Sequence, residues 1–390
     1  PEPVKPEQQV HRDMMFLAGE LLHRGAQTHL ERRAAEFLRD RFREYTLDVE
    51  VDDFHAIENP TYLFGSYFGE FVVVGFFALL GWPAFALAYG AGVLISFLAE
   101  FHGLRLFGRW LPEYETQNVV ARFLSLRPRK LIVVAAHYDS GGASPLSDPG
   151  VVPHLRFGLR AMLTCMVVVV ATCGAEAWAQ MHGAEVALWI VYLRWGMIGV
   201  LMLGAAFMFY ASRQVEDIRG ANGNASGVAA LLYLAERFKA EGVDGVDLWL
   251  AATGSHEAWM SGVRRILRQA KRTGQKVYFL NIESVGAGKL SYTAKEGMLL
   301  AQPCGKAMVA AAAAHAGDFG ARRAEVRAVP TGAHLPLAGG CEAMSIVGLD
   351  EDGVPAYWNQ INDRIMEVDD ANIVHAAKYA EAVIRDLAKS

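Results

Sequence analysis

Histidine and carboxylate side chains follow three apolar segments of the sequence, each at the point where a strand is expected to end. The first segment leads into AAHYDSGG with His137 and Asp139, the second into TGSHEAW with His256 and Glu257, and the third into NIESVGAG with Glu283. A histidine two residues from an aspartate suits a metal-binding imidazole that a carboxylate orients. Because ligands in open α/β sheets gather at the carboxyl ends of the strands, these residues predict one shared site. The alternative is a set of solvated loop charges.

The segments that must position these residues alternate between strands and helices. Strands are expected at 130–136, 246–252, 276–282 and 344–350, and amphipathic helices at 224–239, 261–272 and 372–389. Short continuous apolar runs are typical of strands buried on both faces. Asn224 or Ser226 is available to cap the helix over 224–239. The alternation predicts an α/β fold with an open, largely parallel sheet and helices on both faces.

The composition is too apolar for an ordinary water-soluble enzyme, since 53% of the 390 residues are hydrophobic and only 20% are charged. The net charge of −5 offers no basic surface for nucleic acid, so nucleic-acid binding is excluded. The cysteines lie far apart and form no CxxC pair, which favours a reducing compartment over a disulfide scaffold or a zinc knuckle. They are Cys165, Cys173, Cys304 and Cys341. The sequence opens without a secretory signal pattern, and we expect a cytoplasmic N-terminus.

Most of the apolar excess lies in two stretches, 61–107 and 157–210. Each holds two segments near the length that crosses a bilayer, separated by the turn signal at 81–83 in the first stretch and by the polar MHGAE in the second. The sequence therefore predicts two transmembrane hairpins with four spans. Buried core helices of a large domain are the alternative.

Arginines flank the ends of both hairpins that join the rest of the chain, while the tight turns carry neither lysine nor arginine. The flanking residues are Arg105, Arg109, Arg156, Arg160, Arg213 and Arg219. The positive-inside rule then predicts an integral protein of a bacterial-type inner membrane with its main domain on the cytoplasmic side. Glu70 and Arg194 fall about ten residues into their spans, where unpaired charges are unfavourable. Either they pair with each other or a partner helix, or the span boundaries differ and both lie at an interface.

The predicted division of the chain is one α/β domain interrupted twice. The domain comprises 1–60, 108–156 and 211–390, the first hairpin 61–107 and the second hairpin 157–210.

The order of six motifs is similar to that of family twenty-eight of the metallopeptidases, which holds two-zinc aminopeptidases, glutaminyl cyclases and endoplasmic-reticulum metallopeptidases. The motifs are AAHYDSGG, GANGNASGVAALLYLAE, ATGSHEAWMSG, FLNIESVGAG, TGAHLPL and PAYWNQINDRIMEVD. The resemblance covers nearly all of the chain outside the hairpins. It implies a mixed sheet of about eight strands between helices, as in zinc aminopeptidases.

Part of the metal site that the resemblance implies is kept. His137 matches the family's first zinc ligand, with Asp139 as the carboxylate behind it. Glu257 matches the glutamate ligand of the second zinc, and Glu283 matches the next carboxylate ligand.

Three other positions depart from the family pattern. Gly223 stands where the resemblance implies a bridging aspartate, His256 where it implies the glutamate base, and Asn359 where it implies the last histidine ligand. One zinc would keep His137 and Glu283, the other only Glu257, whereas zinc sites use three or four protein ligands. A pair of dications also needs a bridging anion, which glycine lacks.

We therefore expect no bound cofactor and a peptidase-like fold whose catalysis is lost, a pseudoenzyme. Its expected role is a binding or structural subunit of a membrane complex, with the lipid bilayer and a membrane protein as partners through the hairpins. The alternative is a divergent zinc-dependent exopeptidase (aminopeptidase) or cyclase, in which His256 or His334 serves as a substitute ligand beside His137 and Glu283. His256 would otherwise be the doubtful replacement for the catalytic base, because a neutral imidazole lacks a carboxylate's charge.

Overall fold

The computed structural model describes residues 5–239 and 242–389, so the predicted domain ends at 1–4 and 390 lie outside the described residues. Two compact units make up the chain. The α/β unit comprises Pro1–Glu58, Glu113–Pro153 and Glu216–Ser390, and the helical unit comprises Asn59–Pro112 and His154–Val215.

In the described part of the α/β unit, nine strands form one mixed sheet in the order β1-β2-β6-β3-β7-β11-β8-β10, with β9 paired to β8. The strands are β1 (Val49–Ile57), β2 (Glu113–Phe123), β3 (Lys130–His137), β6 (Val246–Thr253), β7 (Val277–Glu283), β8 (Lys289–Glu296), β9 (Gln302–Pro303), β10 (Arg322–Val326) and β11 (Glu342–Leu349). The central strands β6, β3, β7 and β11 run parallel. The prediction of a mixed, largely parallel sheet with flanking helices is confirmed.

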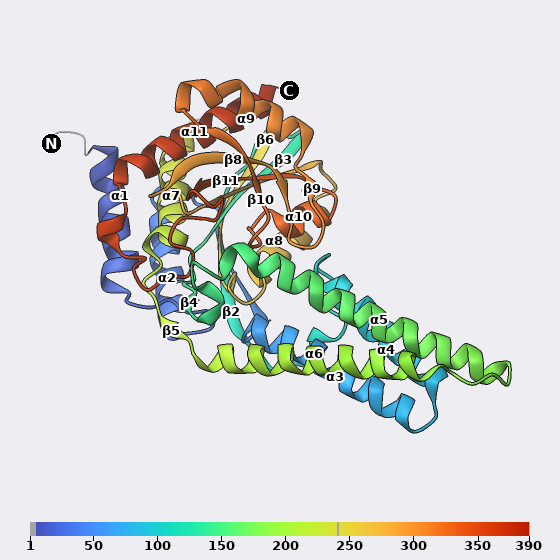
Figure 1. Ribbon diagram of the computed structural model, residues 1–390. Helices are drawn as coiled ribbons and strands as arrows, with labels where there is room; N and C mark the ends of the chain where they lie inside the picture. Colours follow the sequence, from blue (N-terminus) through green and yellow to red (C-terminus); the bar gives the residue numbers. More distant parts are fainter. Residues whose placement is uncertain (1–4, 240–241, 390) are drawn as a thin grey trace. The chain divides into compact units, whose positions relative to one another are not determined.

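Helices cover both faces of this sheet (Figure 1). The larger core packs α1 (Pro6–Met14), α2 (His29–Arg43), α7 (Ser226–Phe238), α9 (Lys306–Phe319) and α11 (Asp370–Lys389) onto one face. The other face carries α8 (Ser261–Arg272) and α10 (His334–Ala338). Ile132, Val134 and Ala136 of β3 point into the larger core, because alternate side chains of a strand share a face.

The start of α7 differs from the prediction that Asn224 or Ser226 caps it. A π-helical turn, η5 (Ala221–Ala225), leads directly into the helix, and no side chain caps it. Gly220 enters the turn with a left-handed φ of 58°, which a glycine adopts without strain. The Asn224 side chain is used elsewhere, as described below.

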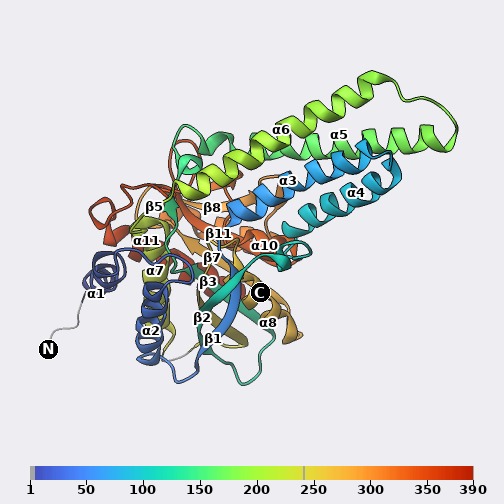
Figure 2. The ribbon, with the colours of Figure 1, turned by 90° about the horizontal axis from the view of Figure 1, so that it is seen from below.

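The helical unit consists of two hairpins, α3 (Pro60–Leu79) with α4 (Pro83–Glu100) and α5 (Leu155–Met181) with α6 (Leu188–Arg213). Within it α3 packs against α6 and α4 against α5 (Figure 2). Asn59 caps α3 by accepting a hydrogen bond from the Thr61 N–H at 2.8 Å. Among the described residues, four helices are long and apolar enough to cross a membrane: α3, α4, a segment spanning Val152–Met181, and α6.

The two charges inside the predicted spans do not pair with each other. Glu70 of α3 accepts a hydrogen bond from the Tyr89 hydroxyl of α4 at 2.6 Å. Arg194 of α6 is buried and forms an ion pair with Glu176 of α5. Each charge is thus satisfied by the other helix of its own hairpin.

Candidate functional site

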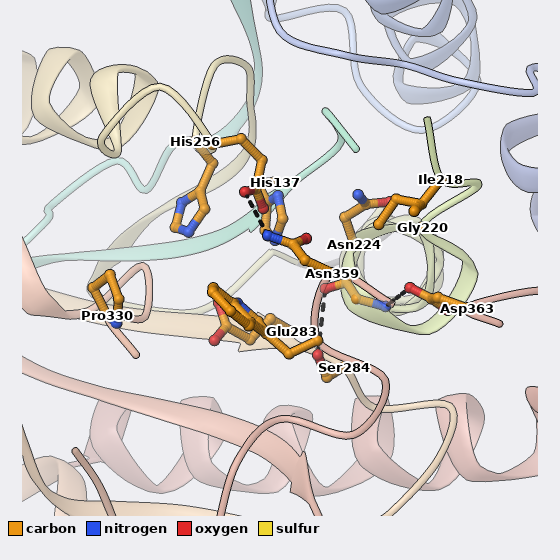
Figure 3. A pocket seen from close by; sticks show the side chains of 13 residues that line it. His137, Ile218, Gly220, Asn224, His256, Glu283, Ser284, Pro330, Asn359 and Asp363 are labelled. Atoms are coloured by element: carbon orange, nitrogen blue, oxygen red, sulfur yellow. Dashed lines mark hydrogen bonds between the residues drawn. The ribbon is translucent and has the colours of Figure 1, made fainter. Parts of the chain in front are cut away.

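The parallel centre of the sheet brings the predicted site residues to one edge. His137 is the last residue of β3 and Glu283 the last of β7, while His256 and Glu257 follow β6 and Asn359 follows β11. Because β6, β3, β7 and β11 are parallel neighbours, their carboxyl ends meet. All five residues line the same pocket (Figure 3).

His137 is fixed by Asp139. Its Nδ1 lies 3.1 Å from the Asp139 backbone carbonyl and 3.7 Å from the Asp139 Oδ1 atom, so Nε2 is the nitrogen left for a ligand. Burial by itself lowers the pKa of His137, but the Asp139 carboxylate and the charges of Glu257 and Glu283 outweigh it and raise the pKa to about 9. Without a metal, His137 is therefore an imidazolium at neutral pH.

His256 lies against His137, with ring centroids 4.2 Å apart and planes 24° from parallel. Its Nδ1 is buried and accepts or donates no hydrogen bond. Burial and the positive charge of His137 lower the pKa of His256 to about 3, so this imidazole is neutral. One ligand atom each from His137, His256 and Glu283 lie within 4.8 Å of one another.

Two buried carboxylates hold the turn that carries His256. Glu31 of α2 accepts a hydrogen bond from the Ser255 N–H at 2.8 Å, and Asp139 accepts one from the Glu257 N–H at 2.9 Å. Ser255 has a φ of +48°, an uncommon conformation for a residue other than glycine. The backbone N–H groups of the residues before and after His256 are thus bonded to the carboxylates of Glu31 in α2 and of Asp139 in the loop that follows β3.

The remaining two carboxylates bond to amides rather than to each other. Glu257 accepts a hydrogen bond from Asn359 Nδ2 at 3.0 Å, and Glu283 accepts one from Asn281 Nδ2 at 2.9 Å. Burial raises the pKa of both carboxyl groups, and the positive charge of His137 opposes this shift.

Asp363 is a pocket residue that the sequence reasoning missed. Its two carboxylate oxygens accept hydrogen bonds from the N–H groups of Asn222 and Gly223 at 2.6 and 2.9 Å. A Cβ atom built on Gly223 would lie 3.1 Å from Asp363 Oδ2. Burial raises the pKa of Asp363 to about 6 despite these backbone donors. The signal in the sequence was its place in the motif PAYWNQINDRIMEVD, four residues after Asn359.

A buried arginine, Arg24, connects the loop after β3 with the start of α7 behind the pocket. Arg24 is fully buried and donates from Nε to the Tyr138 carbonyl at 2.9 Å and from Nη2 to Asn224 Oδ1. Asn224 in turn donates to the Asp139 carbonyl at 2.7 Å. The residue that was expected to cap α7 therefore links α7 to the loop that orients His137.

His334, the second candidate for a substitute ligand, starts α10 and is buried, but it does not join the donor group of His137, His256 and Glu283. Among the described residues, His256 is the histidine that the fold brings to the remaining donors.

The donor set does not fit the two-zinc centre that the resemblance implied. Gly223 supplies no donor to bridge two ions, and the Asn359 amide is engaged with Glu257. The part of the pocket that water can occupy is about 20 Å³, about the space of one water molecule or one ion. The geometry suits a single ion bound by His137, His256 and Glu283.

Comparisons with known proteins agree with this fold. The model of the family described as Peptidase family M28 matches residues 204–384. The chain resembles an aminopeptidase from Aneurinibacillus sp. strain AM-1, with a TM-score of 0.57 and 12% identity over 97% of this chain and 93% of that one. No curated protein matches the chain.

Two further structures show the same likeness. BSAP, a zinc aminopeptidase from Bacillus subtilis, has a TM-score of 0.56 and 12% identity over 98% of this chain and 95% of that one. A glutaminyl cyclase from an Acidobacteriales bacterium has a TM-score of 0.55 and 13% identity over 100% of this chain and 97% of that one. At such identities the likeness establishes the fold and leaves the chemistry to the residues described above.

Proposed function

We propose that this chain, which the model of Peptidase family M28 matches over residues 204–384, is a membrane-anchored, peptidase-like protein without the family's two-zinc catalysis. The family predicted from the sequence is confirmed, as is the aminopeptidase-like fold. Its proposed role is that of a binding or structural subunit of a membrane complex.

The proposed loss of catalysis rests on the absence of a bridging carboxylate at Gly223. Two zinc ions about 3.5 to 4 Å apart need a bridging anion between them. Glycine offers none, and the nearest carboxylate, Asp363, has both oxygens bonded to backbone N–H groups. This arrangement supports a pocket in which two ions cannot be held together.

Asn359 adds a second obstacle. Its φ of +48° is a conformation that asparagine tolerates better than most residues, and its amide rests on Gly141, where a Cβ would come within 2.1 Å of Asn359 Oδ1. An amide nitrogen bonded to Glu257 is no zinc ligand. The glutamate that the resemblance assigns to the second ion is thus paired with an amide.

Membrane anchoring is proposed from the helical unit. The four helices described above have the length and apolar composition of membrane spans. Large apolar side chains of α6 such as Trp189, Tyr192 and Leu203 are exposed, which suits contact with lipid or with a partner's helices. The arginines at the domain ends of the hairpins support a cytoplasmic position for the α/β unit.

The test measures hydrolysis by the full chain purified in detergent, with zinc added or removed. We expect no turnover of aminoacyl 4-nitroanilides and no cyclisation of peptides with N-terminal glutamine. The positive control is the triple variant Gly223→Asp, His256→Glu and Asn359→His, which restores a bridge, a base and a ligand. It should bind two zinc ions and regain slow aminopeptidase activity once Asp363 shifts by a few tenths of an ångström.

Single reversions should recover little, because such groups act as a unit. Chelator-sensitive turnover by the unaltered chain that His256→Ala abolishes would instead establish the divergent exopeptidase or cyclase. Release of the chain from membranes by alkaline carbonate would contradict the anchoring.

A further inference from the structure

We propose that one face of the first hairpin binds a transmembrane helix of another protein, and that this helix carries a lysine or arginine at the depth of Glu70. Binding of this kind rests on the proposed membrane anchoring and identifies the surface and the chemistry of the membrane partner. The surface, called the Glu70 face below, consists of Glu70 and its neighbours on α3 and α4, which are Val73, Phe77, Phe85, Tyr89 and Gly92.

Glu70 lies near the middle of its helix. The 20 residues of α3 (Pro60–Leu79) rise 1.5 Å each and span about 30 Å, which is the thickness of the hydrocarbon core of a bilayer. Glu70 is about ten residues from both ends of α3, so its carboxylate is too far from the headgroups to reach them. Ionisable residues at such a depth nearly always pair with one another or face a cavity, because an unpaired charge in lipid is unfavourable.

The charge of the Glu70 carboxylate is not balanced within the chain. Its Oε2 atom accepts a hydrogen bond from the Tyr89 hydroxyl at 2.6 Å, which satisfies one acceptor position but supplies no positive charge. Among the described residues, no lysine, arginine or histidine forms an ion pair with Glu70, whereas Arg194 is matched by Glu176. Glu70 is also only half-buried, so its carboxylate is accessible from outside the helical unit.

The surroundings of Glu70 leave room for another helix. Phe85 is 52% exposed and Val73 is 36% exposed, so apolar side chains flank the carboxylate at the surface. Gly92 lies one turn after Tyr89 on α4, and a Cβ atom built on it meets nothing within 4 Å. Small residues let membrane helices approach closely, and polar side chains add hydrogen bonds between them. The Glu70 face combines both features.

The charge favours a different protein over a second copy of this chain. A two-fold contact through the Glu70 face would bring two carboxylates together in lipid, where like charges repel strongly. A second copy also offers no available cation at this depth. Its Arg194 is 2% exposed and engaged with Glu176, and its other arginines in the four helices lie in the first two turns of α5 or at the end of α6. A lysine or arginine on a partner helix supplies the missing charge.

The experiment measures whether a basic model helix binds the full chain in vesicles of phosphatidylcholine, whose headgroups carry no net charge. The probe is a synthetic helix of about 20 leucine and alanine residues with one central arginine and an acceptor fluorophore. The donor fluorophore is attached to His182→Cys in a chain whose four native cysteines are replaced, and energy transfer reports association. We expect the arginine helix to bind about 5- to 30-fold more tightly than the same helix with leucine in place of arginine, because polar contacts between membrane helices have this strength.

Three variants of the chain make the result specific. Glu70→Gln keeps an acceptor for Tyr89 but removes the charge, so it should bind the arginine helix as weakly as the unaltered chain binds the leucine helix. Gly92→Leu should block the Glu70 face. Gly196→Leu is the matched control and should bind normally, because Gly196 is another exposed glycine with open space beside it, on α6. Thermal unfolding in detergent shows whether each variant is folded.

Equal binding of the arginine helix by the unaltered chain and by Glu70→Gln overturns the proposal. Energy transfer between donor- and acceptor-labelled copies of the chain, lost in Gly92→Leu, would show instead that a second copy occupies the Glu70 face. Flotation of the vesicles tests the anchoring separately. A chain that does not float with them contradicts the proposed function together with the Glu70 contact, whereas a chain that floats but does not bind the arginine helix contradicts the Glu70 contact alone.

Discussion

At the scale of single residues, the most heavily bonded buried carboxylate near the site is Glu31. It lies in the first turn of α2 and accepts hydrogen bonds from the N–H groups of Gln27 and Ser255 and from the Thr116 hydroxyl. Burial and, after it, the nearby charge of Asp139 raise its pKa to about 8 although these donors oppose the shift. The carboxyl group therefore titrates in the range where most carboxylates are fully ionised.

This shift predicts a pH-dependent stability. Between the ordinary pKa of a glutamate and a folded pKa of about 8, the folded chain binds more protons than the unfolded one. The stability of the metal-free chain should therefore fall as pH rises from about 5 to 8, by an amount on the order of 3 to 4 kcal/mol from this group. Thermal unfolding in detergent at several pH values measures it.

The substitution Glu31→Gln removes the titrating carboxyl group. The thermal unfolding midpoint of this variant should therefore fall less than that of the wild type between about pH 5 and 8. Glu36→Gln, an exposed position on the same helix, should keep the wild-type slope. Equal slopes for the wild type and Glu31→Gln would show that the hydrogen bonds from Gln27, Ser255 and Thr116 keep Glu31 ionised throughout.

The sequence reveals some site residues and hides others for a physical reason. His137, His256 and Glu283 follow strand-like segments, so their convergence could be predicted from the parallel sheet alone. Arg24 lies in the loop before α2 and Glu31 in α2 itself, where charged residues are ordinarily solvated, and only the folded packing shows them buried.

At the scale of elements, the strands and helices with a clear pattern were predicted well. The strand expected at 130–136 is β3 (Lys130–His137), and the helix expected at 261–272 is α8. The start of α7 was not predicted correctly, because its π-helical turn is stabilised by a distant residue. The Asp363 carboxylate accepts hydrogen bonds from the N–H groups of Asn222 and Gly223. The residues near this turn contain no capping signal that would predict it, because the carboxylate that stabilises it belongs to a distant loop.

The second hairpin depends on the ion pair between Arg194 of α6 and Glu176 of α5. Arg194 is 2% exposed, and its partner is the acidic group closest to it on α5. Breaking a buried pair leaves an uncompensated charge, which costs about 3 to 5 kcal/mol, while removing both charges costs less. Glu176→Gln should therefore destabilise the chain strongly, and adding Arg194→Gln should restore part of the loss.

Unfolding by a denaturing detergent, followed for both single variants and the double variant, measures this coupling. Glu185→Gln, in the loop between α5 and α6, serves as the control because it is exposed. Additive effects of the two substitutions would mean that Arg194 finds its stabilisation elsewhere.

At the scale of the whole molecule, the two hairpins interrupt one continuous sheet. β1 and β2 lie on either side of the first hairpin in sequence, yet Ile57 pairs with Glu113 in an antiparallel ladder. The short strands β4 (Gly142–Ala143) and β5 (Glu216–Asp217) pair in the same way across the second hairpin. If the hairpins cross a membrane as proposed, the chain must leave and re-enter the α/β unit on one side of it, which requires an even number of spans in each insertion.

This requirement fixes the expected topology. In a variant whose four native cysteines are replaced, single cysteines at Gly81 and His182 should react with a membrane-impermeant thiol reagent from the side opposite to a cysteine at Lys389. Both positions lie in the tight turns between α3 and α4 and between α5 and α6. If the α/β unit is cytoplasmic, the turns are labelled in intact cells and Lys389→Cys only after the membrane is opened. Labelling of either turn from the same side as position 389 would mean that its hairpin does not cross the bilayer, because the paired strands forbid a single crossing.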